Sequence, residues 1–165
     1  MTPAITLLKK QKIDFSVHEY DHDPSNTNFG AEAMEKLGLT DQEVFKTLLA
    51  TDGKNYFVAV LPVAYQLSLS KFAKAVGVKK LRMADRASAE RITGYLVGGI
   101  SPIGQKKKLP TMISDTAQSL DKMYISGGRR GLDVGISPDG LTGVLGASFV
   151  DIIDESQRFR IKFLT

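Results

Sequence analysis

The chain has 165 residues, no cysteine and a formal net charge of +4, with 42% hydrophobic and 24% charged residues. This composition is that of one globular domain with a full core. The lack of cysteine excludes disulfide bonds, a thiolate nucleophile and cysteine-based metal sites. No apolar run approaches the roughly 18 residues of a membrane span, and the first residues carry no signal-peptide pattern, so we expect a cytoplasmic protein. The moderate basic excess favours an anionic partner such as RNA only weakly.

The first half of the chain alternates short helices and strands. The patterns predict a helix from Pro3 after a capping Thr2, a strand over 13–20, a loop over 21–29, a helix over 31–37 closed by Gly38, strands over 44–51 and 55–61, and a helix over 71–76 capped by Ser70. Asp52-Gly53-Lys54 separates the two apolar strands, and Asp-Gly in that place is a strong hairpin signal. We therefore expect these strands to be antiparallel neighbours.

The second half continues in the same way. We predict a strand over 78–83, a helix over 86–92 capped by Asp85, a strand over 111–113, a short helix after Ser114, strands over 123–126 and 132–136, a helix from Ser137-Pro138 to about 145, and a strand over 148–153. Hairpin-like turns predict an α/β domain with a mixed, largely antiparallel, β-barrel-like sheet surrounded by helices. We place this single domain at 1–153 and a basic C-terminal extension at 154–165, whose last ten residues form an edge strand, a tRNA contact or a disordered tail.

A glycine-rich segment over 94–105 is the most informative part of the sequence. It contains Gly98-Gly99 within an apolar run, and Lys106-Lys107-Lys108 follows it. Glycine is favoured where another group approaches the backbone closely. Exposed amides flanked by positive charge suggest a site for a phosphate or a carbonyl oxygen. The alternative is a plain turn between strands with a solvated basic tail.

Four polar residues interrupt or end apolar strands. Lys46 lies within a strand, Asp133 is flanked by leucine and valine, Tyr20 ends the first strand, and Ser126 precedes a glycine pair. A buried charge needs a partner, so Lys46 and Asp133 are candidates for a pocket. A strand-end lysine with its ammonium group in water is the competing interpretation for Lys46.

Three other chemistries are disfavoured by the spacing. His18 and His22 lie where a strand runs into a loop, which separates them, so we expect no metal site. The segment from Gly99 to Lys106 resembles a phosphate-binding P-loop, but glutamine takes the lysine position and no hydroxyl residue follows Lys106. No Gly-x-Ser-x-Gly motif supports a serine hydrolase.

Several motifs carry a family resemblance. Phe45-Lys46-Thr47-Leu48, the run from Thr93 to Pro102, Gly104-Gln105-Lys106-Lys107, and Tyr124 to Gly128 with Arg130 to Asp133 are similar to the bacterial YbaK/EbsC family. The resemblance extends over about 1–153 in unbroken order and is strongest to the Cys-tRNA(Pro) deacylase branch. It implies the family fold, a mixed β-barrel wrapped by helices.

The resemblance also implies a trans-editing enzyme that cleaves mischarged Cys-tRNA(Pro), with the substrate's own thiol attacking its ester. It implies catalytic roles for Lys46, Gly98 and Gly99, and substrate-binding roles for Tyr20, Thr47, Tyr95, Ser126 and Asp133. It implies no cofactor and no metal, a tRNA 3′ end as ligand, prolyl-tRNA synthetase as a partner, no membrane, and a monomer. The alternatives are a noncatalytic module for RNA ends or nucleotides, and editing of another aminoacyl-tRNA such as Ala-tRNA(Pro).

Overall fold

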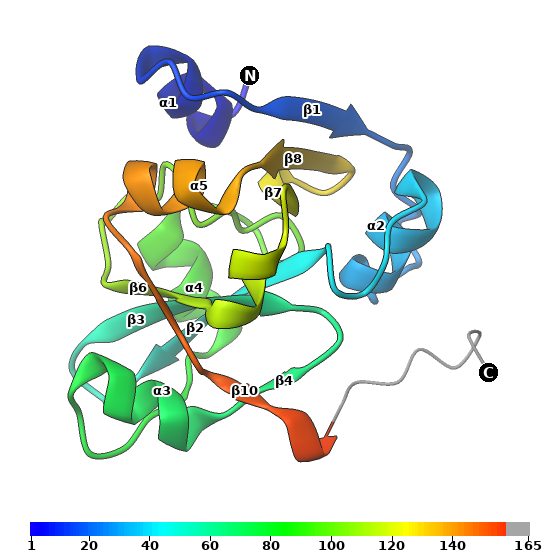
Figure 1. The fold of residues 1–165 in the computed structure, drawn as a ribbon. Coiled ribbons are helices and arrows are strands. Elements are labelled where there is room, and N and C mark those ends of the chain that lie inside the picture. Colours follow the sequence, from blue (N-terminus) through cyan, green and yellow to red (C-terminus); the bar gives the residue numbers. More distant parts are fainter. Residues whose placement is uncertain (158–165) are drawn as a thin grey trace.

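A computed structural model describes residues 1–157 of the chain (Figure 1). The helices are α1 (Pro3–Lys10), α2 (Phe29–Leu37), α3 (Leu69–Val76), α4 (Arg86–Thr93) and α5 (Pro138–Leu145), with 3₁₀ turns η1 (Asp115–Ser119) and η2 (Glu155–Gln157). The strands are β1 (Ser16–Glu19), β2 (Phe45–Thr51), β3 (Tyr56–Pro62), β4 (Gln66–Leu67), β5 (Arg82–Met83), β6 (Thr111–Ser114), β7 (Met123–Arg129), β8 (Leu132–Ile136), β9 (Ser148–Val150) and β10 (Ile153–Asp154).

The strands form three sheets. Their orders are β5-β2-β3-β6-β9, β1-β8-β7 and β10-β4. The β3–β6 and β6–β9 pairs are parallel and the other pairs are antiparallel, which confirms the mixed, largely antiparallel fold. A parallel bridge between Val44 and Tyr124 joins the two larger sheets, although the sheets of residues 1–157 do not close into one barrel. Within that part of the chain, no helix is long and apolar enough to cross a membrane.

Most predicted helix ends are confirmed, and two differ. Thr2 caps α1, Asp85 caps α4 and Ser137 caps α5. Helix α2 begins at Phe29, two residues earlier than predicted, because the Asn28 side chain accepts the Ala31 N–H. Helix α3 is capped by Ser68 rather than by Ser70.

Three predicted strands are shorter or divided. The strand expected over 13–20 is a strand only over 16–19, and the one over 78–83 only over 82–83. The strand expected over 148–153 becomes β9 and β10, because the chain passes from one sheet to another there. The predicted domain boundary after residue 153 falls inside β10, and most of the predicted extension, residues 158–165, lies outside the described residues.

The β2–β3 hairpin separates two cores. One face of β2 contributes Phe45 and Leu49 to a core shared with the β1-β8-β7 sheet and with α1, α4 and α5. Its other face contributes Ala50 to a core with α3. Strand β7 lies against β2 across the first core (Figure 1). Side chains alternate along a strand, so neighbouring residues of β2 face different surroundings, and this determines the geometry of the site.

Candidate active site

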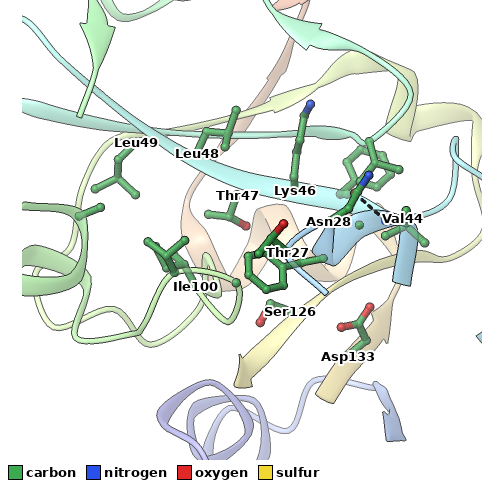
Figure 2. Close-up of a pocket in the computed structure, with 18 of the residues that line it drawn as sticks. Thr27, Asn28, Val44, Lys46, Thr47, Leu48, Leu49, Ile100, Ser126 and Asp133 are labelled. Atoms are coloured by element: carbon green, nitrogen blue, oxygen red, sulfur yellow. Dashed lines mark hydrogen bonds between the residues drawn. The ribbon is translucent and has the colours of Figure 1, made fainter. Parts of the chain in front are cut away.

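A cavity of about 540 Å³ lies where four segments meet: the start of α2, strand β2, the glycine-rich loop, and the β7–β8 hairpin (Figure 2). Its lining is mostly apolar with a few polar groups, the usual character of a small-molecule site. The predicted site residues that line it are Tyr20, Lys46, Thr47, Gly98, Ser126 and Asp133. Segments far apart in the sequence thus bring six of the eight predicted residues to one cavity, while their individual roles stay predictions.

Thr47 presents a hydroxyl group that has no partner among residues 1–157. It lies on the face of β2 that carries Phe45 and Leu49 into the first core. Its Oγ1 atom is buried and makes no hydrogen bond within the described part of the chain. An unsatisfied buried hydroxyl costs stability. In Figure 2, the Thr47 side chain lies on the same side of β2 as Ser126. This hydroxyl is therefore available to a bound ligand.

Lys46 extends from the opposite side of β2. It is paired with Leu61, a residue of the α3 core, whereas Thr47 is paired with Val60 of the first core. Figure 2 shows the two side chains directed away from each other. Burial lowers the pKa of the Lys46 ammonium. Lys46 and Thr47 would thus contact different parts of one ligand.

Ser126 and Asp133 are cross-strand partners on β7 and β8. Residues directly opposite on antiparallel strands share one face of the sheet. Asp133 is 7% exposed, and burial raises its pKa to about 7. The Ser126 hydroxyl accepts the Gly128 N–H at 3.1 Å. The hairpin thus presents a carboxyl group that changes charge near neutral pH.

Tyr20 is fixed at the edge of the same cavity. Its backbone N–H donates to the Gly131 carbonyl at 2.9 Å, which continues the β1–β8 ladder past Glu19. Burial raises the pKa of its phenol well above the ordinary value, and the negative charges of Asp133 and Glu32 raise it further. The phenol therefore stays protonated at neutral pH and can donate a hydrogen bond.

The two glycines of the loop differ in position. Gly98 lines the cavity and has a φ of +92°, a conformation that favours glycine. Gly99 is buried and is not part of the lining, and its N–H donates to the Leu96 carbonyl at 2.9 Å. A Cβ atom there would lie 2.7 Å from Cα of Arg129. We expected both amides to face the substrate, whereas the Gly99 amide is already used within the loop.

Tyr95 also lies outside the cavity lining. Its side chain is 4% exposed, and its hydroxyl donates to the Ile103 carbonyl at 2.6 Å. Burial raises the pKa of this phenol to about 12. The hydrogen bond closes the glycine-rich segment on itself, so this geometry gives Tyr95 a supporting position rather than contact with the cavity.

Phe29 lines the cavity and Arg130 contacts lining residues, and we did not predict either. Phe29 lines the cavity from the first turn of α2. The Arg130 guanidinium carbon lies 4.8 Å from the centre of the Phe29 ring. Asn28 before an apolar helix turn is a capping signal and would have placed Phe29 at this helix start. Nothing local marks Arg130, because its contacts are with residues more than thirty positions away.

The two histidines make separate hydrogen bonds. His18 Nε2 lies 2.8 Å from Ser16 Oγ, and His22 Nδ1 lies 2.6 Å from Glu32 Oε1. Neither contacts Ser126 through a hydrogen bond in the described part of the chain. Residues 1–157 contain no cluster of three or more His, Asp or Glu side chains that could hold a metal ion.

Sequence comparison identifies the family of the chain that forms this cavity. The profile of the aminoacyl-tRNA editing domain matches residues 25–143, which include most of the lining. The chain belongs to the aminoacyl-tRNA editing domain family. A protein of Enterococcus faecalis (strain ATCC 700802 / V583), described as "Putative Cys-tRNA(Pro)/Cys-tRNA(Cys) deacylase EbsC", is 35% identical over 153 residues, which are 92% of each chain.

Other members extend the comparison to larger proteins and to solved structures. A proline–tRNA ligase of Geobacter metallireducens is 29% identical over 97 residues, 59% of this chain but 16% of the ligase. A crystal structure described as "a putative trans-editing enzyme for prolyl tRNA synthetase" has a TM-score of 0.81 at 22% identity, over 92% of this chain and 95% of the other. A hypothetical protein has a TM-score of 0.82 at 25% identity, over 92% and 99%. These structures support the editing-domain fold.

Proposed function

We propose that this protein is a trans-editing aminoacyl-tRNA deacylase that removes cysteine from mischarged Cys-tRNA(Pro). One observation carries the proposal: Thr47, Ser126, Asp133 and the backbone of Gly98 surround a single cavity in a chain of the editing domain family. The Enterococcus faecalis relative, described by a Cys-tRNA deacylase activity, supports the choice of amino acid.

The polar groups suggest how the 3′ end is bound. The ionised Asp133 carboxylate would pair with the α-ammonium group of the aminoacyl residue, and the hydroxyl groups of Thr47 and Ser126 would contact its polar atoms. Lys46, on the other side of β2, would contact the ribose or phosphate of the terminal nucleotide. The amino acid and the tRNA end would thus be held from two sides of one strand.

The reaction then needs no nucleophile from the protein. The cysteine sulfur of the substrate attacks its own ester carbonyl carbon and loses its proton. The carbon–oxygen bond to the ribose breaks, and the ribose oxygen takes up a proton, so that a thiolactone and free tRNA are formed. The cavity contributes proximity by holding thiol and carbonyl in contact, and the Gly98 amide stabilises the negative charge that develops on the carbonyl oxygen.

A serine mechanism has less support. Among the described residues, Ser126 is the only serine in the cavity lining, and its hydroxyl contacts the Gly128 amide. Activation of a serine needs a base within hydrogen-bond reach, and the described part of the chain brings neither histidine to it. The geometry therefore favours attack by the substrate's own thiol.

The proposed substrate also suggests the cellular setting. A single small domain recognises few features of a whole tRNA, so we propose that selection of tRNA(Pro) comes from working beside prolyl-tRNA synthetase. We propose that the protein acts in the cytoplasm as a monomer with no cofactor. The matching region within a proline–tRNA ligase is consistent with such a partnership.

The decisive experiment measures release of labelled amino acid from Cys-tRNA(Pro), Ala-tRNA(Pro) and Pro-tRNA(Pro). We expect release from Cys-tRNA(Pro) and little from the other two. Lys46→Ala should abolish the release, whereas Lys54→Ala, in the exposed turn between β2 and β3, should leave it unchanged.

Two results would count against the proposal. Faster release from Ala-tRNA(Pro) would show that alanine, rather than cysteine, is the amino acid that the protein removes. No release from any of the three, with binding of uncharged tRNA retained, would favour the noncatalytic RNA-end module. Analysis of the product distinguishes the chemistry, because thiol attack yields a thiolactone before free cysteine.

A further inference from the structure

Arg130 and Gly98 are connected through one peptide group at the rim of the cavity. The guanidinium Nε and Nη2 atoms of Arg130 donate to the Val97 carbonyl oxygen at 3.0 and 2.7 Å. That carbonyl belongs to the trans peptide whose nitrogen is the Gly98 N–H. In a trans peptide the C=O and N–H bonds point in opposite directions. The Gly98 N–H is therefore turned away from Arg130.

Other contacts hold the two neighbouring peptides in place. The Val97 N–H donates to Glu90 Oε2 at 2.7 Å, and the following turn is closed by the bond from Gly99 to Leu96. Arg130 is half-buried and lies over the Phe29 ring. A Cβ atom on Gly98 would lie 2.7 Å from Arg130 Nε and 2.8 Å from Phe29 Cζ. Glycine at this position thus lets the guanidinium reach the carbonyl.

The Gly98 N–H is available as a donor. Gly98 lines the cavity, and its amide has no hydrogen-bond acceptor among residues 1–157. A cation at the carbonyl end of a peptide polarises the group, and hydrogen bonds in such a chain strengthen one another. Arg130 would therefore both orient this N–H and make it a better donor.

We propose that Arg130 is a positioning residue for deacylation: it holds the Val97–Gly98 peptide so that the Gly98 N–H meets the ester carbonyl oxygen as negative charge develops on it. This inference rests on the proposed function. It assigns Arg130 an effect on the chemical step rather than on tRNA binding, although an arginine beside an RNA site would ordinarily be expected to contact phosphate.

The experiment compares wild type with Arg130→Ala and Arg130→Lys on two substrates, Cys-tRNA(Pro) and the 3′-cysteinyl ester of adenosine, which has no phosphate. We expect Arg130→Ala to lower kcat on both by about 10- to 100-fold, because a small misplacement of a catalytic group can cost about 100-fold, with KM little changed. The lysine ammonium offers one donor group instead of the two guanidinium nitrogens, so the kcat of Arg130→Lys should lie between those of wild type and Arg130→Ala. Added guanidinium ion should partly restore kcat in Arg130→Ala.

Arg129→Ala is the matched control. Arg129 is the exposed neighbour, and its guanidinium pairs with Glu19 at 3.0 Å, so this change removes the same charge without touching the Val97 peptide. We expect wild-type rates on both substrates. Thermal unfolding of every variant separates loss of folding from loss of rate; if Arg130→Ala does not fold, Arg130→Lys provides the same comparison of kcat with KM.

Two outcomes overturn the inference alone. One is a higher KM of Arg130→Ala for the tRNA with no change on the adenosine ester, which would make Arg130 a phosphate contact. The other is wild-type kcat in Arg130→Ala. Failure of the proposed function looks different, because wild type itself would then release nothing from either substrate, and this inference would fall with it.

Discussion

Asp133 lies opposite Ser126 of β7 on one side and opposite His18 of β1 on the other. The central strand of this small sheet thus holds a carboxyl group between two polar residues, on the face that borders the cavity. Its backbone neighbours Leu132 and Val134 pack in the core. Burial raises the pKa of Asp133 to about 7, so its charge state can control binding within the physiological range.

Asp133→Asn should change the pH dependence of deacylation. Only the ionised carboxylate can pair with an ammonium group, so the wild-type single-turnover rate should rise as the pH passes through about 7. The asparagine variant should be slow and should lack that step. The rates are measured across neutral pH with the same Cys-tRNA(Pro). An unchanged step in Asp133→Asn would assign the titration to another group.

The same substitution should have the opposite effect on stability. The folded pKa of about 7 lies above the ordinary value of 3.8, so the folded chain binds more protons between these values and stability falls as the pH rises through that window. Above pH 7 the asparagine variant should be the more stable protein, by on the order of 2–4 kcal/mol. Urea unfolding on both sides of the window measures this, and equal stabilities above it would show that Asp133 ionises normally.

Thr47→Val should separate activity from stability. The Thr47 hydroxyl is buried and has no partner in the part of the chain that the structure describes. Replacing it with a methyl group therefore loses no hydrogen bond there and should leave the free energy of unfolding unchanged or higher. If the hydroxyl contacts the substrate, deacylation should fall by about tenfold, which corresponds to a hydrogen bond of about 1.4 kcal/mol.

Thr51→Val is its control on the same strand. The Thr51 hydroxyl donates to the Asn55 carbonyl at 2.7 Å and accepts the Gly53 N–H at 3.0 Å. We expect this variant to lose about 1–3 kcal/mol and to keep its kcat. Urea unfolding and single-turnover rates are compared for the pair. Equal losses of rate in both variants would mean that the effect of Thr47 is structural.

The sequence predicted elements best where local chemistry decides them. Thr2, Asp85 and Ser137 cap helices through hydroxyl or carboxyl groups within three residues, and Asp-Gly formed the β2–β3 hairpin. The failures have non-local causes. Strand β5 is short because only two of its residues pair with β2, and the last strand divides because its ends pair with different sheets.

The site was predicted to a similar degree. Asp133 and Lys46 were candidates because they are polar residues in apolar strands, and the structure brings both to the cavity. Thr47, which also lines it, was implied only by the family resemblance. The family resemblance also predicted site roles for Gly99 and Tyr95. The Gly99 amide and the Tyr95 hydroxyl are hydrogen-bonded within the glycine-rich loop. Spacing in a sequence does not indicate whether a donor already has an acceptor. Arg130 contacts a carbonyl thirty-three residues away, so its position beside the site could be recognised only from the folded structure.

Tyr95→Phe should therefore act on stability rather than on substrate binding. Removing the hydroxyl leaves the buried Ile103 carbonyl without this donor, which should cost about 1–3 kcal/mol. We expect KM to stay near the wild-type value, because Tyr95 is outside the cavity lining. Thermal unfolding and the KM for Cys-tRNA(Pro) are measured together. A raised KM with unchanged stability would restore the predicted contact between Tyr95 and the substrate.

Glu32→Gln should weaken the segment that leads into the cavity. Glu32 is 1% exposed and accepts hydrogen bonds from His22 Nδ1, the Asp23 N–H and Lys36 Nζ at 2.6, 2.8 and 3.1 Å. Burial alone would raise its pKa, but these bonds outweigh burial and lower it. The resulting stability is present above the ordinary pKa of 4.5 and is lost as the pH falls through the lower folded value.

The glutamine variant should thus unfold more easily by about 1–3 kcal/mol at neutral pH, and its stability should depend less on acid than that of wild type. Glu35→Gln, on the exposed side of the same helix, is the control and should change neither property. The segment that Glu32 holds runs directly into Asn28 and Phe29 at the cavity, so a loosened cluster should also raise KM. Urea unfolding at neutral and acidic pH distinguishes the two variants, and equal acid sensitivity of Glu32→Gln and wild type would exclude Glu32 as its source.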